Sequence, residues 1–138
     1  MSYEMIEYNG VRYAEVIRAD LRVEKTYFFS PPDSSFQFGL LAHESGFIEA
    51  PHYHHSVQRS INDLQQMFVV QRGVVAIGFY DEGGSMFREV VLNQGDAINL
   101  IHGAHSVRVI EDMQCITVKQ GPFLGNALDK VNIEEKKS

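Results

Sequence analysis

The sequence predicts an all-β domain, because short runs of β-branched and aromatic residues recur along the chain and no segment keeps a helical period. The breaks between the runs carry residues that favour turns, such as Ser30-Pro31-Pro32-Asp33 and Asp81-Glu82-Gly83-Gly84. Short runs separated by turn residues are typical of successive antiparallel strands. We therefore expect a β-sandwich or a β-barrel.

Turn residues delimit the expected strands in order along the chain. The breaks lie at 30–33, 72–73, 81–84, 93–96 and 111–112. Residues 56–65 show no clear pattern, and within them we expect a turn or a short helical cap over the mouth of a barrel at 60–63. The expected strands are 11–17, 23–29, 36–42, 67–71, 74–80, 87–92, 97–100, 106–110 and 114–119.

The chain has 138 residues, which is enough for one domain with a substantial core and too few for two ordinary domains. We expect that domain to cover residues 1–130, followed by a polar tail at 131–138. Hydrophobic residues make up 44% of the chain and charged residues 22%, as in water-soluble globular proteins. No apolar run is long enough to span a membrane, and residues 1–5 do not resemble a secretory signal. We therefore expect a cytoplasmic protein.

The net charge of −6 disfavours a nucleic-acid partner, since no cluster of basic residues with interleaved aromatics offsets it. Cys115 is the only cysteine, so an internal disulfide is excluded. It lies in an apolar run, 113–118, and the sequence shows no neighbouring base that would activate the thiol. We therefore expect Cys115 to pack in a core strand rather than to act as a nucleophile.

The histidines carry the strongest functional signal. His52 and His54 form a His-x-His pair, which on a strand places both imidazoles on one face, about 7 Å apart at the backbone. A third histidine, His105, follows a Gly-Asp turn later in the chain, and together the three could bind a metal ion or act as acid and base. His55 must point away from the face that holds His54, so we expect it to be exposed. His102, three residues before His105, could contact a substrate.

The segments around these histidines resemble the two motifs of the cupin superfamily. In residues 46–54 a glycine precedes the His-x-His pair with five residues between them, and residues from Gln66 to Gly73 match the end of the first motif. Residues 95–105 resemble the second motif, and the two motifs together span close to half of the chain. The resemblance implies a single-domain cupin jelly roll, a double-sheet β-barrel with a ligand cavity.

The resemblance also implies a metal site formed by His52, His54 and His105, with Gln66 at the place where cupins usually have a glutamate ligand. Three neutral imidazoles and an amide oxygen leave the charge of a divalent ion uncompensated. Such a set is closer to a three-histidine zinc site than to the two-histidine, one-carboxylate site of iron oxygenases. We expect zinc, nickel or iron as the ion and an anionic ligand, and oxygen chemistry is disfavoured.

Residues 53–59, together with 118–125 and the following Asp129-Lys130, are similar to small bacterial cupins associated with surface-polysaccharide synthesis. This likeness implies a small carbohydrate as the ligand. Because many cupins pair through an N-terminal strand, it also favours a homodimer.

Three functions are compatible with the sequence. The first is an isomerase or epimerase that acts on a phosphorylated or nucleotide-linked sugar, with His52, His54 and His105 as the catalytic set. The second is a non-catalytic cupin that binds or senses a sugar. The third is a metal-dependent dioxygenase, which requires a carboxylate ligand; Glu44 or Glu49 could supply it only if the barrel register places that residue inward.

Overall fold

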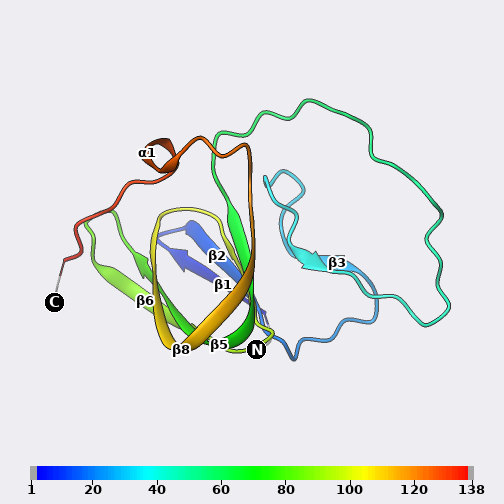
Figure 1. Cartoon of the computed structure of the whole chain (residues 1–138), viewed down its shortest axis with the longest axis horizontal. Coiled ribbons are helices and arrows are strands. Elements are labelled where there is room, and N and C mark those ends of the chain that lie inside the picture. Colours follow the sequence, from blue (N-terminus) through cyan, green and yellow to red (C-terminus); the bar gives the residue numbers. More distant parts are fainter. Residues whose placement is uncertain (1–2, 137–138) are drawn as a thin grey trace. The chain divides into compact units, whose positions relative to one another are not determined.

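The computed structural model describes residues 3–136 as a chain of β-strands with one four-residue helix (Figure 1), which confirms the all-β expectation. The chain divides into a first unit, up to Leu21 and from Leu64 onward, and a second unit, Arg22–Asp63. Within the described residues, no helix has the length and apolar character needed to cross a lipid bilayer. The elements are β1 (Tyr3–Tyr8), β2 (Val11–Ile17), β3 (Tyr27–Phe28), β4 (Gly39–Leu40), β5 (Gln66–Tyr80), β6 (Met86–Leu92), β7 (Ala97–Leu100), β8 (Ala104–Lys119) and α1 (Asn126–Asp129).

One antiparallel sheet builds the first unit. Its strand order is β1-β2-β7-β5-β6, and β8 pairs with the other edge of β5 along most of its length. β5 is therefore the central strand, because its first residues pair with β7 and its second half pairs with β6. The sheet curls strongly and forms a half-barrel (Figure 1).

Two of the expected turns lie inside strands. Arg72-Gly73 is part of β5 and Glu111-Asp112 is part of β8, so each strand covers two of the expected short runs. The pairing of β5 with β8 shifts register three times between Val70 and Val75. Gly73 has a φ of 85°, and an extra residue at such a bulge bends a strand without ending its pairing. The turn residues thus mark bends of two long strands rather than their ends.

The second unit contains much shorter strands than the expected runs 23–29 and 36–42. β3 and β4 form a two-residue antiparallel pair, and the backbone N–H of Ala42 then donates to Oγ1 of Thr26 over 3.1 Å. Pro31 and Pro32 follow the first run and cannot donate to a ladder, which limits further pairing. The expected helical cap at 60–63 is also wrong, since these residues form no helix and only Asp63 lies at a bend.

Two elements lie outside the expected set. β1 contains the fully buried Ile6 among residues that are mostly polar or half-buried, so its sequence pattern is weak. Its stability comes from antiparallel pairing with β2 and from Glu4, which forms ion pairs with Arg18 and Arg88. The other element, α1, is a single turn that is too short to show a period.

The hydrophobic core lies within the curl of the first unit and takes residues from β1, β2, β5, β6 and β7. The rings of Tyr13, Phe79 and Phe87 pack together, with centroids 4.9 Å to 6.4 Å apart. Each fully buried aliphatic or aromatic side chain contributes about 1.5–3 kcal/mol. The buried core residues are Ile6, Tyr13, Ala14, Val16, Phe68, Val70, Val75, Ile77, Phe79, Val90, Leu92, Ile98 and Leu100.

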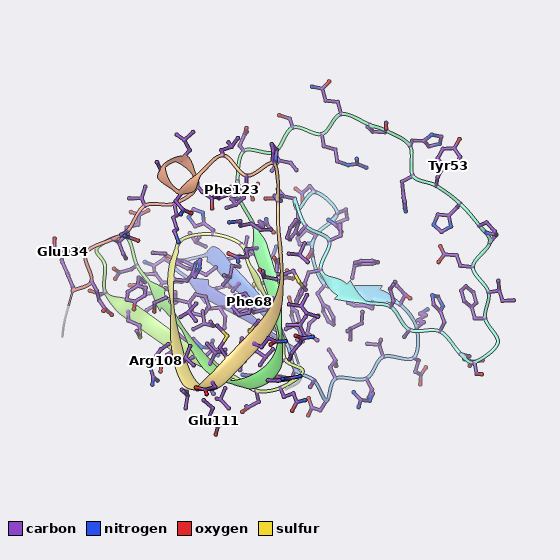
Figure 2. All side chains as sticks on the ribbon, viewed as in Figure 1. Tyr53, Phe68, Arg108, Glu111, Phe123 and Glu134 are labelled. Carbon is purple, nitrogen blue, oxygen red and sulfur yellow. The ribbon has the colours of Figure 1, made fainter. Side chains whose placement is uncertain are left out.

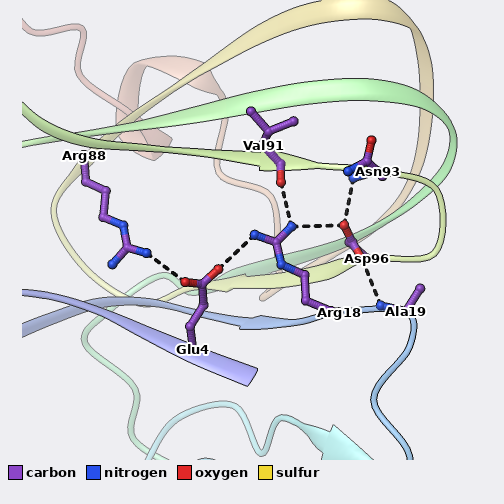
Figure 3. A network of polar contacts seen from close by, with 7 residues as sticks. All are labelled: Glu4, Arg18, Ala19, Arg88, Val91, Asn93 and Asp96. Atoms are coloured by element: carbon purple, nitrogen blue, oxygen red, sulfur yellow. Dashed lines mark hydrogen bonds and ion pairs between the residues drawn. The ribbon is translucent and has the colours of Figure 1, made fainter. Parts of the chain in front are cut away.

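Asp96, from the second cupin-like motif, connects three segments of this unit (Figure 3). Its carboxylate is almost completely buried and accepts hydrogen bonds from the backbone N–H groups of Ala19 and Asn93, each over 2.8 Å. Arg18 lies 3.1 Å from the same carboxylate and also donates to the carbonyl of Val91. Asp96 therefore holds the turn before β7 against the end of β2, a structural role.

Candidate functional site

The His-x-His pair lies in a loop of the second unit rather than on a strand. The ring centroids of His52 and His54 are 5.3 Å apart, and the ring planes meet at 79°. Tyr53 lies between them in the sequence and projects into solvent from the loop (Figure 2), with an exposed fraction of 83%. The structure thus brings the two predicted imidazoles together without a strand.

Glu49 joins this pair. Its Oε1 lies 3.4 Å from Nε2 of His52, and the other ring nitrogen, Nδ1, donates to the carbonyl of Ala50 over 2.9 Å. A carbonyl oxygen only accepts, so this contact places the proton of a neutral His52 on Nδ1 and leaves Nε2 as the basic nitrogen. The loop therefore presents a carboxylate and two imidazoles, which we call the Glu49-His52-His54 cluster.

The other histidines of the loop have aromatic neighbours. His43 stacks on Phe47 with the ring centroids 4.0 Å apart. His55 is exposed, as expected, and its ring lies 5.9 Å from that of Tyr53. Glu44, the other candidate carboxylate, lies at a turn in which its carbonyl accepts from the N–H of Phe47. The stacking contact gives His43 a packing role in the loop, whereas His55 contacts only an exposed tyrosine.

Gln66 and His105, the other two predicted ligands, belong to the first unit. Gln66 begins β5, pairs with Lys119 and donates from its amide Nε2 to Oγ1 of Thr117 over 3.0 Å. His105 pairs with Phe79, near the other end of the same strand. The structure therefore does not bring Gln66 and His105 together, because most of β5 separates them.

His105 is paired with the core residue Phe79 across the ladder between β5 and β8. Residues paired across antiparallel strands project to the same face, so His105 lies on the face of Phe79, whose side chain is buried. Burial lowers the pKa of His105, and a hydrogen bond with the backbone of Gly103 opposes the effect only in part. The residue as a whole remains exposed at the edge strand, so the imidazole is a neutral group within reach of solvent.

We expect this burial to make the stability of the fold depend on pH. A histidine with a lowered folded-state pKa binds more protons when unfolded, so its stabilising effect is complete above about pH 6.5 and is lost as the pH falls through the folded value. Between about pH 7.5 and pH 5, the His105→Gln variant should therefore lose less unfolding free energy than the wild-type protein does. Urea titrations at both pH values measure this difference. His55→Gln is the matched control, and equal losses in wild type and His105→Gln would refute the expectation.

Cys115 behaves as expected from the sequence. Its side chain is partly buried and packs against the core cluster, and burial raises the pKa of the thiol. Its Sγ lies 3.3 Å from the sulfur of Met113. A thiol with a raised pKa is a weak nucleophile at neutral pH, so these contacts favour the packing role.

The first unit contains a pocket that none of the four predicted ligands lines, although Ala104, next to His105 in the chain, does. It has a volume of about 380 Å³ and is formed by the turns before β6 and β8 together with residues of the C-terminal tail. Sequence reasoning missed this pocket, although His102 was a candidate for substrate contact. The polar and aromatic residues that line it are Tyr13, Tyr80, Asp81, Glu82, His102 and Glu134.

Within residues 3–136, no group of three or more histidine, cysteine, aspartate or glutamate side chains is arranged to hold a metal ion. Comparisons with models of protein families, with curated proteins and with solved structures find no match to this chain. The geometry of the described residues therefore carries the functional argument.

Proposed function

We propose that this protein is a metal-binding cupin enzyme of the isomerase or epimerase type, acting on a phosphorylated or nucleotide-linked sugar in surface-polysaccharide synthesis. The observation that carries the proposal is the Glu49-His52-His54 cluster, whose two rings are 5.3 Å apart and whose carboxylate is 3.4 Å from one of them. The strongly curled antiparallel sheet and the two motifs support the finer assignment of the fold as a cupin jelly roll.

The donor types in this cluster are those that divalent transition-metal ions take, although within residues 3–136 the three side chains are not arranged to hold one. Imidazole nitrogens and a carboxylate oxygen are ligands of zinc, nickel and iron, and Nε2 of His52 is held as the basic nitrogen by the bond from Nδ1 to Ala50. His52, His54 and Glu49 would hold the ion, and the predicted set of four ligands cannot act as a whole because Gln66 and His105 lie near opposite ends of β5. A bound ion supplies Lewis-acid polarisation of a sugar carbonyl.

When no ion is bound and the imidazole nitrogens are free, the chain's own groups can transfer protons in such a reaction. An imidazole whose pKa is near neutrality can remove a proton beside a carbonyl and return it to the neighbouring carbon. Glu49 lies where it can stabilise the protonated ring of His52 after this step. Two imidazoles 5.3 Å apart offer one base and one acid to the same small substrate.

Titration with zinc tests the metal part of the proposal. We expect His52→Ala and His54→Ala each to weaken zinc binding at least about tenfold, because each removes a direct ligand, and Glu49→Gln to weaken it by about the same factor. His43→Ala is the matched control, since it removes an imidazole that stacks on Phe47 in the same loop. His105→Gln tests whether the first unit contributes a ligand. Unchanged affinity in both His52→Ala and His54→Ala would refute the metal site.

Isotope exchange tests the catalytic part. Nucleotide-linked keto sugars incubated with the protein in deuterated water should take up deuterium at the carbon next to the carbonyl, as seen by NMR. His52→Ala should lose this exchange. Sugar binding without any exchange would refute catalysis and favour the sugar-binding or sensor alternative. The cytoplasmic location and the homodimer stay predictions.

A further inference from the structure

The pocket of the first unit is lined by a tyrosine whose hydroxyl has no hydrogen-bond partner among the described residues. Tyr13 is only 5% exposed and lines the pocket with its ring against Gly103, where an added Cβ would collide with the ring. Within residues 3–136, the phenolic oxygen of Tyr13 takes part in no hydrogen bond, and it is not among the fully buried unpaired atoms, so it is open to the pocket. A ligand in the pocket would provide the missing partner.

The walls around this hydroxyl include three carboxylates. Asp81, Glu82 and Glu134 line the pocket, and Glu134 lies on the C-terminal tail (Figure 2). The tail is attached to the turn before β6, because the backbone N–H of Lys136 donates to the carbonyl of Gly84 over 2.9 Å. A positive charge also lies near these carboxylates. The ammonium of Lys136 is 3.7 Å from the point where a Cβ added to Gly83, a residue of the pocket wall, would lie. The three carboxylates leave the pocket with a net negative charge.

Both phenols at the pocket stay protonated at neutral pH. Burial, followed by the charges of Glu82 and Asp81, raises the pKa of Tyr13. The hydrogen bond with Ser106 lowers the pKa of Tyr80, but burial and Glu135 together outweigh it and the net direction is upward. Protonated phenols donate hydrogen bonds, whereas the carboxylates accept them. The pocket therefore offers donors to a hydroxyl oxygen and acceptors to an ammonium.

We propose that this pocket binds a small organic cation that carries a primary ammonium on a hydroxylated carbon skeleton, with the ammonium against Asp81, Glu82 and Glu134 and a hydroxyl against Tyr13. The inference is independent of the proposed function, since none of the Glu49-His52-His54 cluster lines this pocket. The volume of about 380 Å³ is within the range of small-molecule sites.

Binding of glucamine, compared with sorbitol, tests the proposal on the full chain. The two compounds share one polyol skeleton and differ by an amine in place of a hydroxyl, and an alkylamine is protonated at neutral pH. At low ionic strength we expect glucamine to bind at least about tenfold more tightly, because the carboxylates attract only the cation. Shifts of the amide NMR signals of Gly84 and Gly103 should locate the ligand.

Variants connect binding to the named side chains. Glu82→Gln and Glu134→Gln should each reduce the preference for glucamine about threefold, and the double variant should remove it. Tyr13→Phe should weaken both compounds about fivefold, since a buried hydrogen bond is lost while the ring packing remains. Glu111→Gln is the control with the same change of charge away from the pocket. Equal affinity for glucamine and sorbitol, no detectable binding, or unchanged preference in the double variant would overturn the proposal.

Discussion

Replacing Asp96 by alanine is expected to destabilise the protein by about 3 kcal/mol, because the change removes a buried carboxylate that accepts from two backbone N–H groups and from Arg18. This loss is at the low end of the range expected when a buried ion pair is broken. The reason is that Arg18 still has a partner in the variant, because Glu4 lies 2.9 Å away. Urea unfolding followed by circular dichroism measures the loss of unfolding free energy.

Two further variants separate shape from charge at this position. Asp96→Asn keeps the side-chain shape and one acceptor oxygen, so we expect an intermediate loss. Asp112→Ala removes an exposed aspartate from the bend of β8 and should change stability by less than about 0.5 kcal/mol. A loss for Asp96→Ala no larger than that for Asp112→Ala would show that the connections in Figure 3 do not stabilise the fold.

Replacing Gly73 by alanine is also expected to lower the free energy of unfolding by about 3 kcal/mol, for a different reason. The φ of 85° is unfavourable for a residue with a Cβ, and this contributes about 1–2 kcal/mol. In addition, the new Cβ would collide with the backbone carbonyl of Asp112 on β8. Because backbone atoms cannot move aside as a flexible side chain can, the ladder between β5 and β8 must open locally, and we expect a total of about 3 kcal/mol.

Gly10→Ala provides the matched control for this substitution. Gly10 has a similar φ of 76°, but nothing lies within 4 Å of the position of its Cβ. The difference between the two variants therefore isolates the collision with Asp112. Equal losses in Gly73→Ala and Gly10→Ala would show that the bend of β5 tolerates a side chain.

The histidines illustrate what local sequence can predict about a site. Alternation in an extended chain places residues i and i+2 on one side, and His52 and His54 lie together accordingly even though no strand forms there. Glu49 joins them because it is three residues away in the same loop. Gln66 and His105 illustrate the opposite case, since their positions depend on the pairing register of β5 and β8, which a single sequence does not reveal.

The sequence by itself determined the all-β class, the bounds of β2 and β7, and the proximity of His52 to His54, because these follow from side-chain periodicity and short-range geometry. Only the tertiary structure decided that the turn residues at Gly73 and at Asp112 bend two long strands, since their backbone conformations depend on each other across the ladder. The same holds for the pocket around Tyr13, whose walls come from segments far apart in the chain. Contacts of that kind arise from the packing of the curled sheet, and no local pattern encodes them.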